Sequence, residues 1–433
     1  MSSQNSKLFE RVNDPLTDIN EAWSSARLKH ITQINPDSLS GDEPDDWEIE
    51  YVDISSVDSI GEIKETERMP LEDAPSRAQR FVQDGDIIVS TVRTYLKAIA
   101  YIEEPPSSLV VSTGFAVIRP NDEIQPRFLW RVLQADPFVE WIVANSKGVS
   151  YPAINPSRLG DLAIPIPPAE TQDAIVSFLD DRTARIDALI EKNQRLVELL
   201  EEKQSALVEK SVIEGTNERE FEANDRLEVL EEHPTGWDVR RAKTLFIPRD
   251  DRGHDDLPLL EVSLNHGVRL REENEERTAW VASDLGDMKR VAPGDIVYNK
   301  MRLWQGAVDH SEYEGLVSPD YTVLEPRPEA NPEYYAYLLR TEAYKTEVNR
   351  RSYGLVDDRN RIYWKQFGDM PLLRPPREEQ DEVVAQIQRS SQQIEELQNK
   401  VQEAIDLLKE KRQALITAAV TGQIDVTDGP EGE

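Results

Sequence analysis

The sequence predicts a mixed α/β protein with two repeated domains, each followed by a long helix, and pseudo-two-fold symmetry. Residues 167–172 and 375–380 both read Pro-Pro-x-Glu-x-Gln, at an offset of 208 residues. After each copy, apolar residues recur at alternating steps of three and four, which is the spacing of a coiled-coil seam. Before each copy, short apolar runs bounded by turn residues are typical of strands. We expect the two helices to pair as an antiparallel coiled coil.

The predicted seam follows matching positions of the two heptad segments, at about 43 residues each. At 1.5 Å per residue, each segment would form a rod on the order of 60 Å long. A lone rod leaves its apolar seam in water, so we expect the two seams to pack together; pairing between molecules is the alternative. Asn193, at a core position, would help to fix the alignment. The predicted helix-pairing residues are Ile186, Leu189, Asn193, Leu196, Leu200, Leu207, Ile394, Leu397, Val401, Leu408 and Leu415.

The repeat also predicts the domain organisation, because 433 residues can hold two domains of ordinary size. Polar and acidic segments are expected to form tails and a linker. The predicted order is a flexible tail (1–20), domain 1 (21–165), a Pro-Pro turn and long helix (166–214), an acidic linker (215–236), domain 2 (237–373), a second turn and helix (374–424) and an acidic tail (425–433).

Within the domains, a Gly-Asp turn feeds an apolar strand in each copy. Gly85-Asp86 and Gly294-Asp295 are both followed by β-branched residues. Each copy continues with a second strand that ends at a proline, and then with a helix that starts at a proline. These patterns cover residues 114–118 and 127–133 in the first copy, and residues 320–324 and 333–339 in the second. Each domain is therefore expected to be rich in strands at its middle.

The composition is strongly acidic, with a formal net charge of −33, and Arg outnumbers Lys by about two to one. An acidic excess with few lysines indicates a halophilic protein of a salt-rich cytoplasm. At molar salt the Debye length is ~3 Å, so net charge does not exclude a DNA partner and local charge decides. With no cysteine and five scattered histidines, we expect no zinc site and no thiol nucleophile. The absence of a long apolar run or leader predicts a cytoplasmic protein outside the membrane.

Two short strings resemble catalytic motifs, and we interpret both as structural. Residues 331–334 resemble an amino-methyltransferase box, but the matching residues 125–128 of the first copy read as a plain helix start. Asp45, Glu62 and Lys64 resemble a nuclease metal site. The second copy lacks that pattern, and an acidic chain produces it easily by chance. The sequence therefore predicts no catalytic site.

Basic and aromatic residues cluster against this composition, at matching places in the two copies. Residues 340–365 have an excess of basic over acidic residues, and Arg93 aligns with Arg302 at an offset of 209 residues. Arginine and aromatic side chains on loops suit phosphate positioning and base-edge reading; charges that only pair with local carboxylates are the alternative. The DNA-binding candidates are Arg93, Tyr95, Lys97, Lys147, Tyr151, Lys300, Arg302, Trp304, Gln305, Arg350, Arg351, Tyr353, Arg359 and Arg361.

Residues 162–172 and 411–422, with the repeated Gly-Asp strands, resemble the DNA specificity subunit of type I restriction-modification systems. The resemblance covers nearly the whole chain; Arg374 departs from it, because an apolar residue is expected before the second Pro-Pro pair. It implies a non-catalytic subunit whose two target recognition domains each bind half of a split site in double-stranded DNA. It also implies that the paired helices dock two methyltransferase subunits and that a restriction and translocase subunit joins them.

The same resemblance implies that this chain holds no cofactor, because S-adenosylmethionine, ATP and Mg²⁺ would belong to the partner subunits. Two rival functions remain open. A self-contained restriction or modification enzyme would methylate or cut DNA as the purified chain alone. A structural coiled-coil protein without DNA function would explain the helices but would leave the repeated basic loops without a role.

Overall fold

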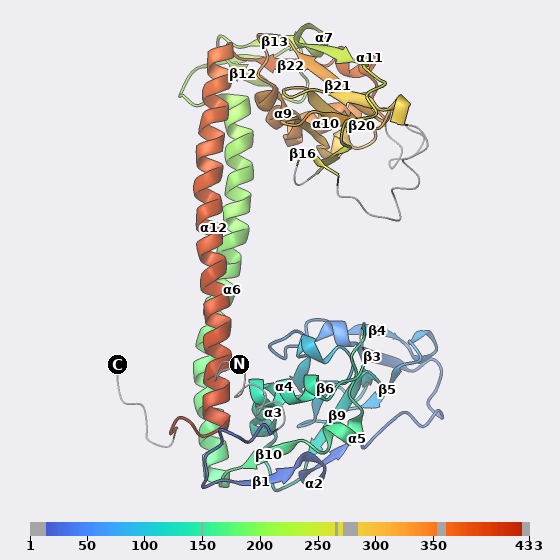
Figure 1. The fold of residues 1–433 in the computed structure, drawn as a ribbon, viewed down its shortest axis with the longest axis vertical. Helices are drawn as coiled ribbons and strands as arrows, with labels where there is room; N and C mark the ends of the chain where they lie inside the picture. The colour runs from blue at the N-terminus through green and yellow to red at the C-terminus, as the bar shows by residue number, and fades with distance from the viewer. Residues whose placement is uncertain (1–13, 149, 265–266, 272–284, 353–360, 427–433) are drawn as a thin grey trace. The chain divides into compact units, whose positions relative to one another are not determined.

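The computed structural model describes residues 14–148, 150–264, 267–271, 285–352 and 361–426. The chain divides into two compact units, which we call unit 1 (residues 1–194 and 402–433) and unit 2 (residues 195–401). The long helices α6 (Ala169–Glu214) and α12 (Arg377–Val420) each contribute residues to both units (Figure 1).

Unit 1 contains two four-stranded sheets and a short strand pair. The first sheet is antiparallel and has the order β2 (Thr32–Ile34), β9 (Phe115–Pro120), β6 (Ile87–Ser90) and β7 (Ile99–Tyr101). The second has the order β4 (Glu67–Pro70), β3 (Glu48–Val52), β8 (Leu109–Ser112) and β5 (Ala78–Phe81). Strand β1 (Ser24–Arg27) pairs with β10 (Ala163–Ile166). The helices are α2 (Leu28–Ile31), α3 (Pro126–Gln134), α4 (Asp136–Ala144) and α5 (Pro156–Leu159).

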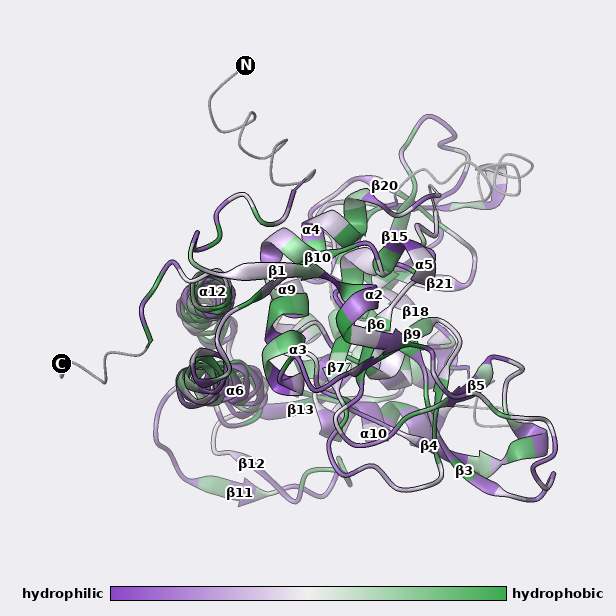
Figure 2. Cartoon of the chain, turned by 90° about the horizontal axis from the view of Figure 1, so that it is seen from below, coloured by the Kyte–Doolittle hydropathy of each residue, from purple (hydrophilic) through white to green (hydrophobic). Residues whose placement is uncertain are grey.

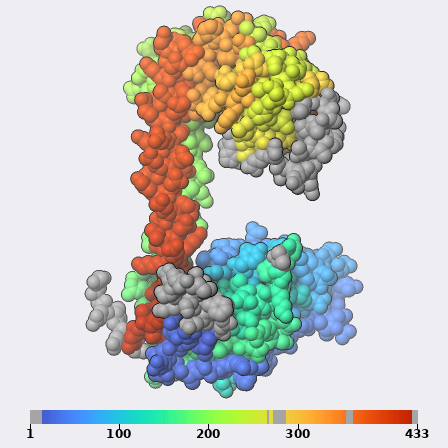
Figure 3. Space-filling model, viewed as in Figure 1, coloured from blue at the N-terminus to red at the C-terminus, as the bar shows by residue number. Residues whose placement is uncertain are grey.

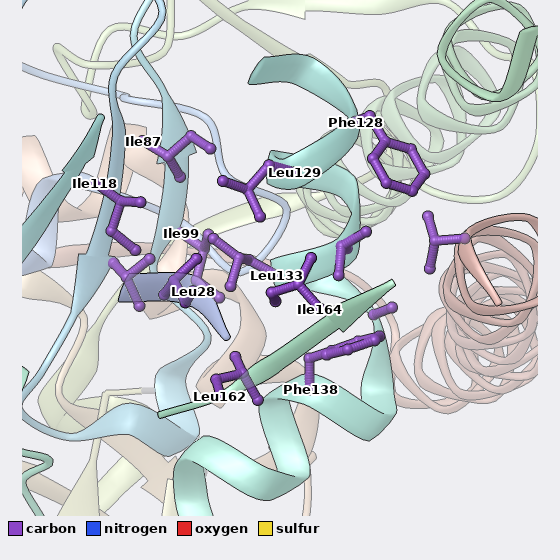
Figure 4. Close-up of a cluster of buried hydrophobic side chains, with 14 of the residues drawn as sticks. Leu28, Ile87, Ile99, Ile118, Phe128, Leu129, Leu133, Phe138, Leu162 and Ile164 are labelled. Atoms are coloured by element: carbon purple, nitrogen blue, oxygen red, sulfur yellow. The ribbon is translucent and has the colours of Figure 1, made fainter. Parts of the chain in front are cut away.

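The core of unit 1 lies on both faces of β6, because successive side chains of a strand point to opposite faces. Ile87 joins a cluster with Leu129 and Leu133 of α3, shown in Figure 4. Ile88 joins a separate cluster with Val111 of the second sheet. Much of α3 is accordingly green, the colour of hydrophobic residues, in Figure 2. The predicted strand after Gly85-Asp86 is therefore confirmed as a fully buried one.

Unit 2 repeats the first sheet with the same order of strands. This sheet has the order β14 (Phe246–Arg249), β21 (Tyr321–Pro326), β18 (Ile296–Asn299) and β19 (Val308–His310). Two-stranded pairs among its described residues include β13 (Asp238–Arg241) with β22 (Pro371–Arg374), β15 (Leu260–Ser263) with β16 (Gly267–Leu270), and β17 (Lys289–Val291) with β20 (Gly315–Val317). The helices are α7 (Ala242–Leu245), α9 (Pro332–Arg340), α10 (Glu342–Arg351) and α11 (Trp364–Gly368). The predicted strands and helices of the second copy are confirmed.

The segment expected to be a linker, residues 215–236, contains ordered structure. Strand β11 (Phe221–Ala223) pairs with β12 (Glu232–Pro234), and Leu227 between them is fully buried in the core of unit 2. The acidic composition of this segment gave no periodicity from which a hairpin could be recognised.

The Pro-Pro turns are held by a buried glutamine in each unit. The Gln172 side chain donates to the carbonyl of Pro167 at 3.0 Å and accepts from the backbone N–H of Gln125 at 2.8 Å. Gln380 donates to the carbonyls of Pro375 and Glu329, at 2.8 and 3.1 Å, and accepts from the N–H of residue 331 at 2.8 Å. The repeated motif thus ties the start of each long helix to the start of α3 or α9.

Arg374, the departure from the family pattern, is explained by the strand that it faces. Its guanidinium forms an ion pair with Asp238, which is its partner in the register of β13 and β22. The matching pair of unit 1 is Ile166 with Ser24, which contains no charge. An arginine is therefore accommodated here because a carboxylate lies directly across the strand pair.

The buried stripe of each long helix differs from the predicted seam at alternate positions. Leu189, Leu196 and Leu397 were expected in the seam, but they are 47%, 42% and 49% exposed. The next residue along the chain is buried or half-buried in each case, namely Ile190, Val197 and Gln398. The predicted Ile186, Leu200 and Ile394 are buried, and Asn193, Leu207, Val401, Leu408 and Leu415 are half-buried.

The shift has a physical cause, because polar side chains occupy part of the buried stripe. Thr183 and Arg412 are 2% and 6% exposed, and Arg412 donates to Asp187 at 2.9 Å within unit 1. A pattern search that follows leucines passes over such positions. Three of the leucines that it selects, Leu189, Leu196 and Leu397, lie on the exposed side of the helices.

Candidate nucleic-acid interface

In unit 1, a strained turn carries three of the predicted DNA-binding residues. The 3-10 turn η3 (Thr94–Leu96) is flanked by Arg93 and Lys97, which have φ values of 54° and 55° in the left-handed region. That conformation costs a non-glycine residue roughly 1–2 kcal/mol. Unit 2 has Gly306, with φ 90°, at the position that matches Lys97. Strain at basic residues of an exposed turn is typical of a functional site.

A second loop completes this surface of unit 1. The Arg93 guanidinium lies 4.8 Å from the centre of the Tyr151 ring, and its backbone N–H donates to Pro152 at 2.8 Å. Bridges of Ala153 to Val92 and Lys147 hold the two loops together. Tyr95 and Tyr151 are 53% and 62% exposed, so aromatic faces are available beside the guanidinium. The structure thus brings the predicted residues of unit 1 together.

The matching turn of unit 2, η5 (Leu303–Gln305), is less open. Arg302 and Gln305 are exposed, whereas the Trp304 indole N–H donates to the carbonyl of Met301 at 2.9 Å. The Lys300 amine donates to the carbonyl of Pro319 at 2.6 Å. Arg361 lies beside this turn, with Nη2 3.7 Å from Sδ of Met301. This unit therefore offers guanidinium and amide groups at its turn.

Two other candidates of unit 2 serve a buried carboxylate. Glu347 of α10 is 3% exposed, and it pairs with Arg351 at 2.5 Å and Arg350 at 3.5 Å. A buried carboxylate requires such partners, so these arginines have a structural role that the sequence analysis did not assign. The candidates Tyr353 and Arg359 lie outside the described residues.

Except for Lys97, the remaining basic candidates within the described residues differ from most arginines there in lacking a carboxylate partner. Many exposed arginines elsewhere are paired, as Arg68 is with Glu50 and Arg290 with Glu314, although Arg182, Arg327 and Arg389 are exposed and form no ion pair with a described residue. Within the described ranges, no ion pair is formed by Arg93, Lys147, Lys300, Arg302 or Arg361, and of the candidates on the turns only Lys97 has one, with Asp136 at 3.1 Å. In a chain with 83 acidic and 50 basic residues, unpaired cations on matching turns leave positive charge available for a ligand.

The sequence analysis missed Leu96, which is 43% exposed in η3. An apolar residue between two basic positions of a turn was the available signal. The strings that resembled catalytic motifs have local roles: Asn331 caps α9 by accepting from two backbone N–H groups, and Lys64 pairs with Glu62 and Asp58. Among the described residues, three or more metal-ligating side chains do not come together anywhere. Over the same residues, we find no helix with the length and apolarity needed to cross a membrane.

Residues 20–199 match the family described as the type I restriction modification DNA specificity domain.

Individual relatives are specificity subunits. The chain is 29% identical over 132 residues to the HindI specificity subunit of Haemophilus influenzae, covering 30% of this chain and 29% of that protein. It is 28% identical over 229 residues to the MjaIX specificity subunit of Methanocaldococcus jannaschii, covering 52% and 46%. The matches therefore span less than half of either relative. A solved structure from a study of type I R-M system assembly has a TM-score of 0.67 at 22% identity, covering 94% of this chain and 99% of that one, which shows a shared fold.

Proposed function

We propose that this chain is the non-catalytic specificity subunit of a type I restriction-modification complex, and that it reads a bipartite site in double-stranded DNA. Residues 21–165 and 237–373 would be the two target recognition domains. The observation that carries this proposal is that Arg93 and Arg302, at matching places before the turns η3 and η5, form no ion pair with a described residue. Nothing in a purely structural coiled-coil protein requires these cations to be left without carboxylates.

The two turns suit different contacts with the DNA. Stacking of Arg93 on Tyr151 restricts the guanidinium, which favours a bidentate contact to a guanine edge. Arg302 and Gln305 present a guanidinium and an amide, which suit guanine and adenine respectively. Two recognition domains on one chain gain affinity by bivalency, because binding of one half-site raises the effective concentration of the other domain.

The long helices would pair as an antiparallel coiled coil with pseudo-two-fold symmetry. Within unit 1, Leu179 of α6 and Ile416 of α12 share one core cluster, so the start of one helix meets the end of the other. Within unit 2, Val212 and Val383 do the same with the opposite ends.

Exposed leucines on these helices would dock two methyltransferase subunits. Leu189 and Leu199 of α6 are 47% and 45% exposed, and Leu397 and Leu407 of α12, at an offset of 208 residues, are 49% and 64% exposed. Figure 3 shows much of the surface of α12 uncovered on one side. Equivalent apolar positions on both helices fit two copies of one partner. Methylation, ATP use and cleavage would belong to the partners.

The test selects DNA from a random-sequence library with the chain in complex with its copurified partners. We expect a split consensus for the native chain. Arg93→Ala should degrade one half of the consensus and Arg302→Ala the other half, whereas Arg185→Ala, an exposed and ion-paired residue of α6, should change neither. Absence of any enriched sequence, or loss of neither half in the variants, would contradict the proposal.

A further inference from the structure

We propose that unit 2 has a second DNA contact, a sequence-independent site for backbone phosphate formed by Arg226, Arg240, Arg241 and Arg351. The four arginines line a pocket of about 660 Å³ beside β13 and the end of α10. The proposal rests on the proposed function, because it assumes that the ligand is the DNA bound by the turns. Phosphate contacts position a protein on the duplex without reading its sequence.

The carboxylates near this pocket do not neutralise it, because each one is shared by two cations. Asp238 pairs with Arg240, at 3.1 Å, and with Arg374. Asp369, the one acidic residue lining the pocket, pairs with Lys243 at 2.6 Å and with Arg241 at 3.7 Å. Glu347 pairs with Arg351 and Arg350, and Arg350 has a second partner in Glu228. Around Asp238 and around Asp369, two cations share one carboxylate, which leaves an excess of positive charge.

The pKa of Asp369 is affected by the positive charges around it. The hydrogen bond from Lys243, with the charges of Lys243, Arg241 and Arg351, holds the pKa of Asp369 below its ordinary value of 3.8. Arg226 adds a further guanidinium, whose nearest carboxylate is the exposed Asp225 at 4.0 Å. A pocket that is cationic in a chain of net charge −33 is suited to an anion.

Unit 1 has a matching cluster, which indicates that this feature belongs to the repeat. Asp161, 208 residues before Asp369, pairs with Lys29 at 2.8 Å, Arg158 at 3.4 Å and Arg27 at 3.6 Å. Three cations around one carboxylate again leave an excess of positive charge. Each unit would then hold the backbone beside its own half-site.

The chemistry of the pocket favours DNA over a protein partner. Arginine pairs with phosphate in a bidentate manner, whereas the core of a protein interface needs buried aromatic or aliphatic anchors. Val239 and Pro371 are the apolar residues lining this pocket. Helix α10, which ends at Arg351, begins at a second pocket shared with Gln305 of η5, so one helix connects the candidate base-reading turn with the arginine pocket.

The experiment measures the affinity of the purified full chain for a mixed-sequence duplex by fluorescence anisotropy across a salt series. Each phosphate contact that is lost reduces the slope of log K against log salt by about 0.9. We expect Arg240→Ala with Arg241→Ala to reduce the slope by roughly 1 to 2. The matched control, Arg185→Ala with Arg195→Ala, removes two exposed and ion-paired arginines of α6 and should leave the slope unchanged.

Further variants separate the possible outcomes. Replacing both arginines by lysine keeps the charge and should keep most of the slope, while the library consensus should be the same for all these variants. An unchanged slope in a folded double-alanine variant would overturn the phosphate site, even if Arg93→Ala and Arg302→Ala still alter the consensus. Loss of the copurifying partners with an unchanged slope would overturn it in favour of a protein-binding site. If the native chain binds no DNA, the proposed function fails as well.

Discussion

The two units bury the same carboxylate but supply its guanidinium from different strands. In unit 1, Asp86 is fully buried and makes two hydrogen bonds of 2.8 Å with Arg119 of β9. In unit 2, Asp295 makes the equivalent bonds, of 2.8 and 3.2 Å, with Arg249 of β14. What the two units share is thus a guanidinium that makes two hydrogen bonds with the buried aspartate.

The second acidic partner of the arginine also comes from a different strand region in each unit. Arg119 also pairs with Asp37, which follows β2, whereas Arg249 also pairs with Glu325 of β21. Glu325 occupies the position that matches Arg119, because both residues directly precede the proline that ends their strand. Burial raises the pKa of Asp295 above its ordinary value despite the arginine. The comparison teaches that a repeated aspartate can keep its role while its partner moves.

The largest effect is expected when the arginine is removed. Arg119→Ala leaves Asp86 buried and unpaired, which should lower the free energy of unfolding of unit 1 by about 3–5 kcal/mol. Arg249→Ala should do the same in unit 2. Urea unfolding with hydrogen exchange of β6 and β18 measures both. Arg68→Ala, at an exposed pair, is the control and should cost less than about 1 kcal/mol; a similarly small loss in either test variant would break the equivalence.

The buried glutamines offer the next comparison. Gln380→Ala should destabilise unit 2 by about 1–3 kcal/mol, because it orphans buried backbone groups of the Pro-Pro turn and α9. Gln172→Ala should cost unit 1 less, since Gln172 makes two such bonds where Gln380 makes three. Urea unfolding checks the order of the two losses. Gln392→Ala, on the exposed face of α12, should have little effect; a larger loss for Gln172→Ala would contradict the expected order.

The strained turn provides a substitution that should stabilise the protein. Lys97→Gly removes a left-handed lysine and should raise the stability of unit 1 by about 1 kcal/mol while weakening DNA binding. Gly306→Ala should lower the stability of unit 2, because the φ of Gly306 is 90° and an added Cβ would lie 3.0 Å from Lys345. Thermal unfolding and anisotropy measure the two properties. Lys97→Asn tests the strain separately, since asparagine tolerates this conformation; no gain in either variant would refute the strain.

The smallest effect concerns pH. Asp309 accepts a hydrogen bond from His310 and thereby raises the pKa of His310 above 6.5. The stabilisation is complete below pH 6.5 and is lost as the pH rises through the raised pKa. Unit 2 should therefore lose a little stability, less than about 1 kcal/mol, above pH 6.5. In unit 1 the matching position is Tyr101, which has no such titration there. Chemical unfolding of His310→Gln should show no such loss; persistence of the loss would assign it elsewhere.

The parts of the fold that could be predicted from the sequence are those bounded by turn-forming or helix-starting residues. Gly-Asp turns and helix-starting prolines mark β6, β18, α3 and α9, because these residues restrict the backbone directly. The buried stripe of the long helices was predicted at only some of its positions, since polar residues such as Thr183 and Arg412 are buried in it with hydrogen-bond partners. The partner of Asp295 could not be predicted, because strand pairing and not sequence spacing brings Arg249 to it.

Of the candidate site, too, some residues could be predicted from the sequence and others could not. Arg93 and Arg302 stand out because unpaired cations oppose the composition, and their matching positions are visible in the repeat. The role of Arg350 and Arg351 was available from the helix spacing, since Glu347 precedes them by three and four residues. The arginine pocket was not predictable, because Arg226, Arg240 and Arg351 are distant in sequence and the tertiary fold alone gathers them.

The moved arginine limits how such chains can recombine. Exchange of a whole unit between two genes would transfer the buried aspartate together with its guanidinium. A crossover placed between β14 and β21 would instead join β2, which contains no arginine, to β21 with Glu325, leaving a buried carboxylate beside a second acid and no arginine. Viable hybrids should therefore have their junctions outside the sheet, in the long helices or the segment that connects the repeats.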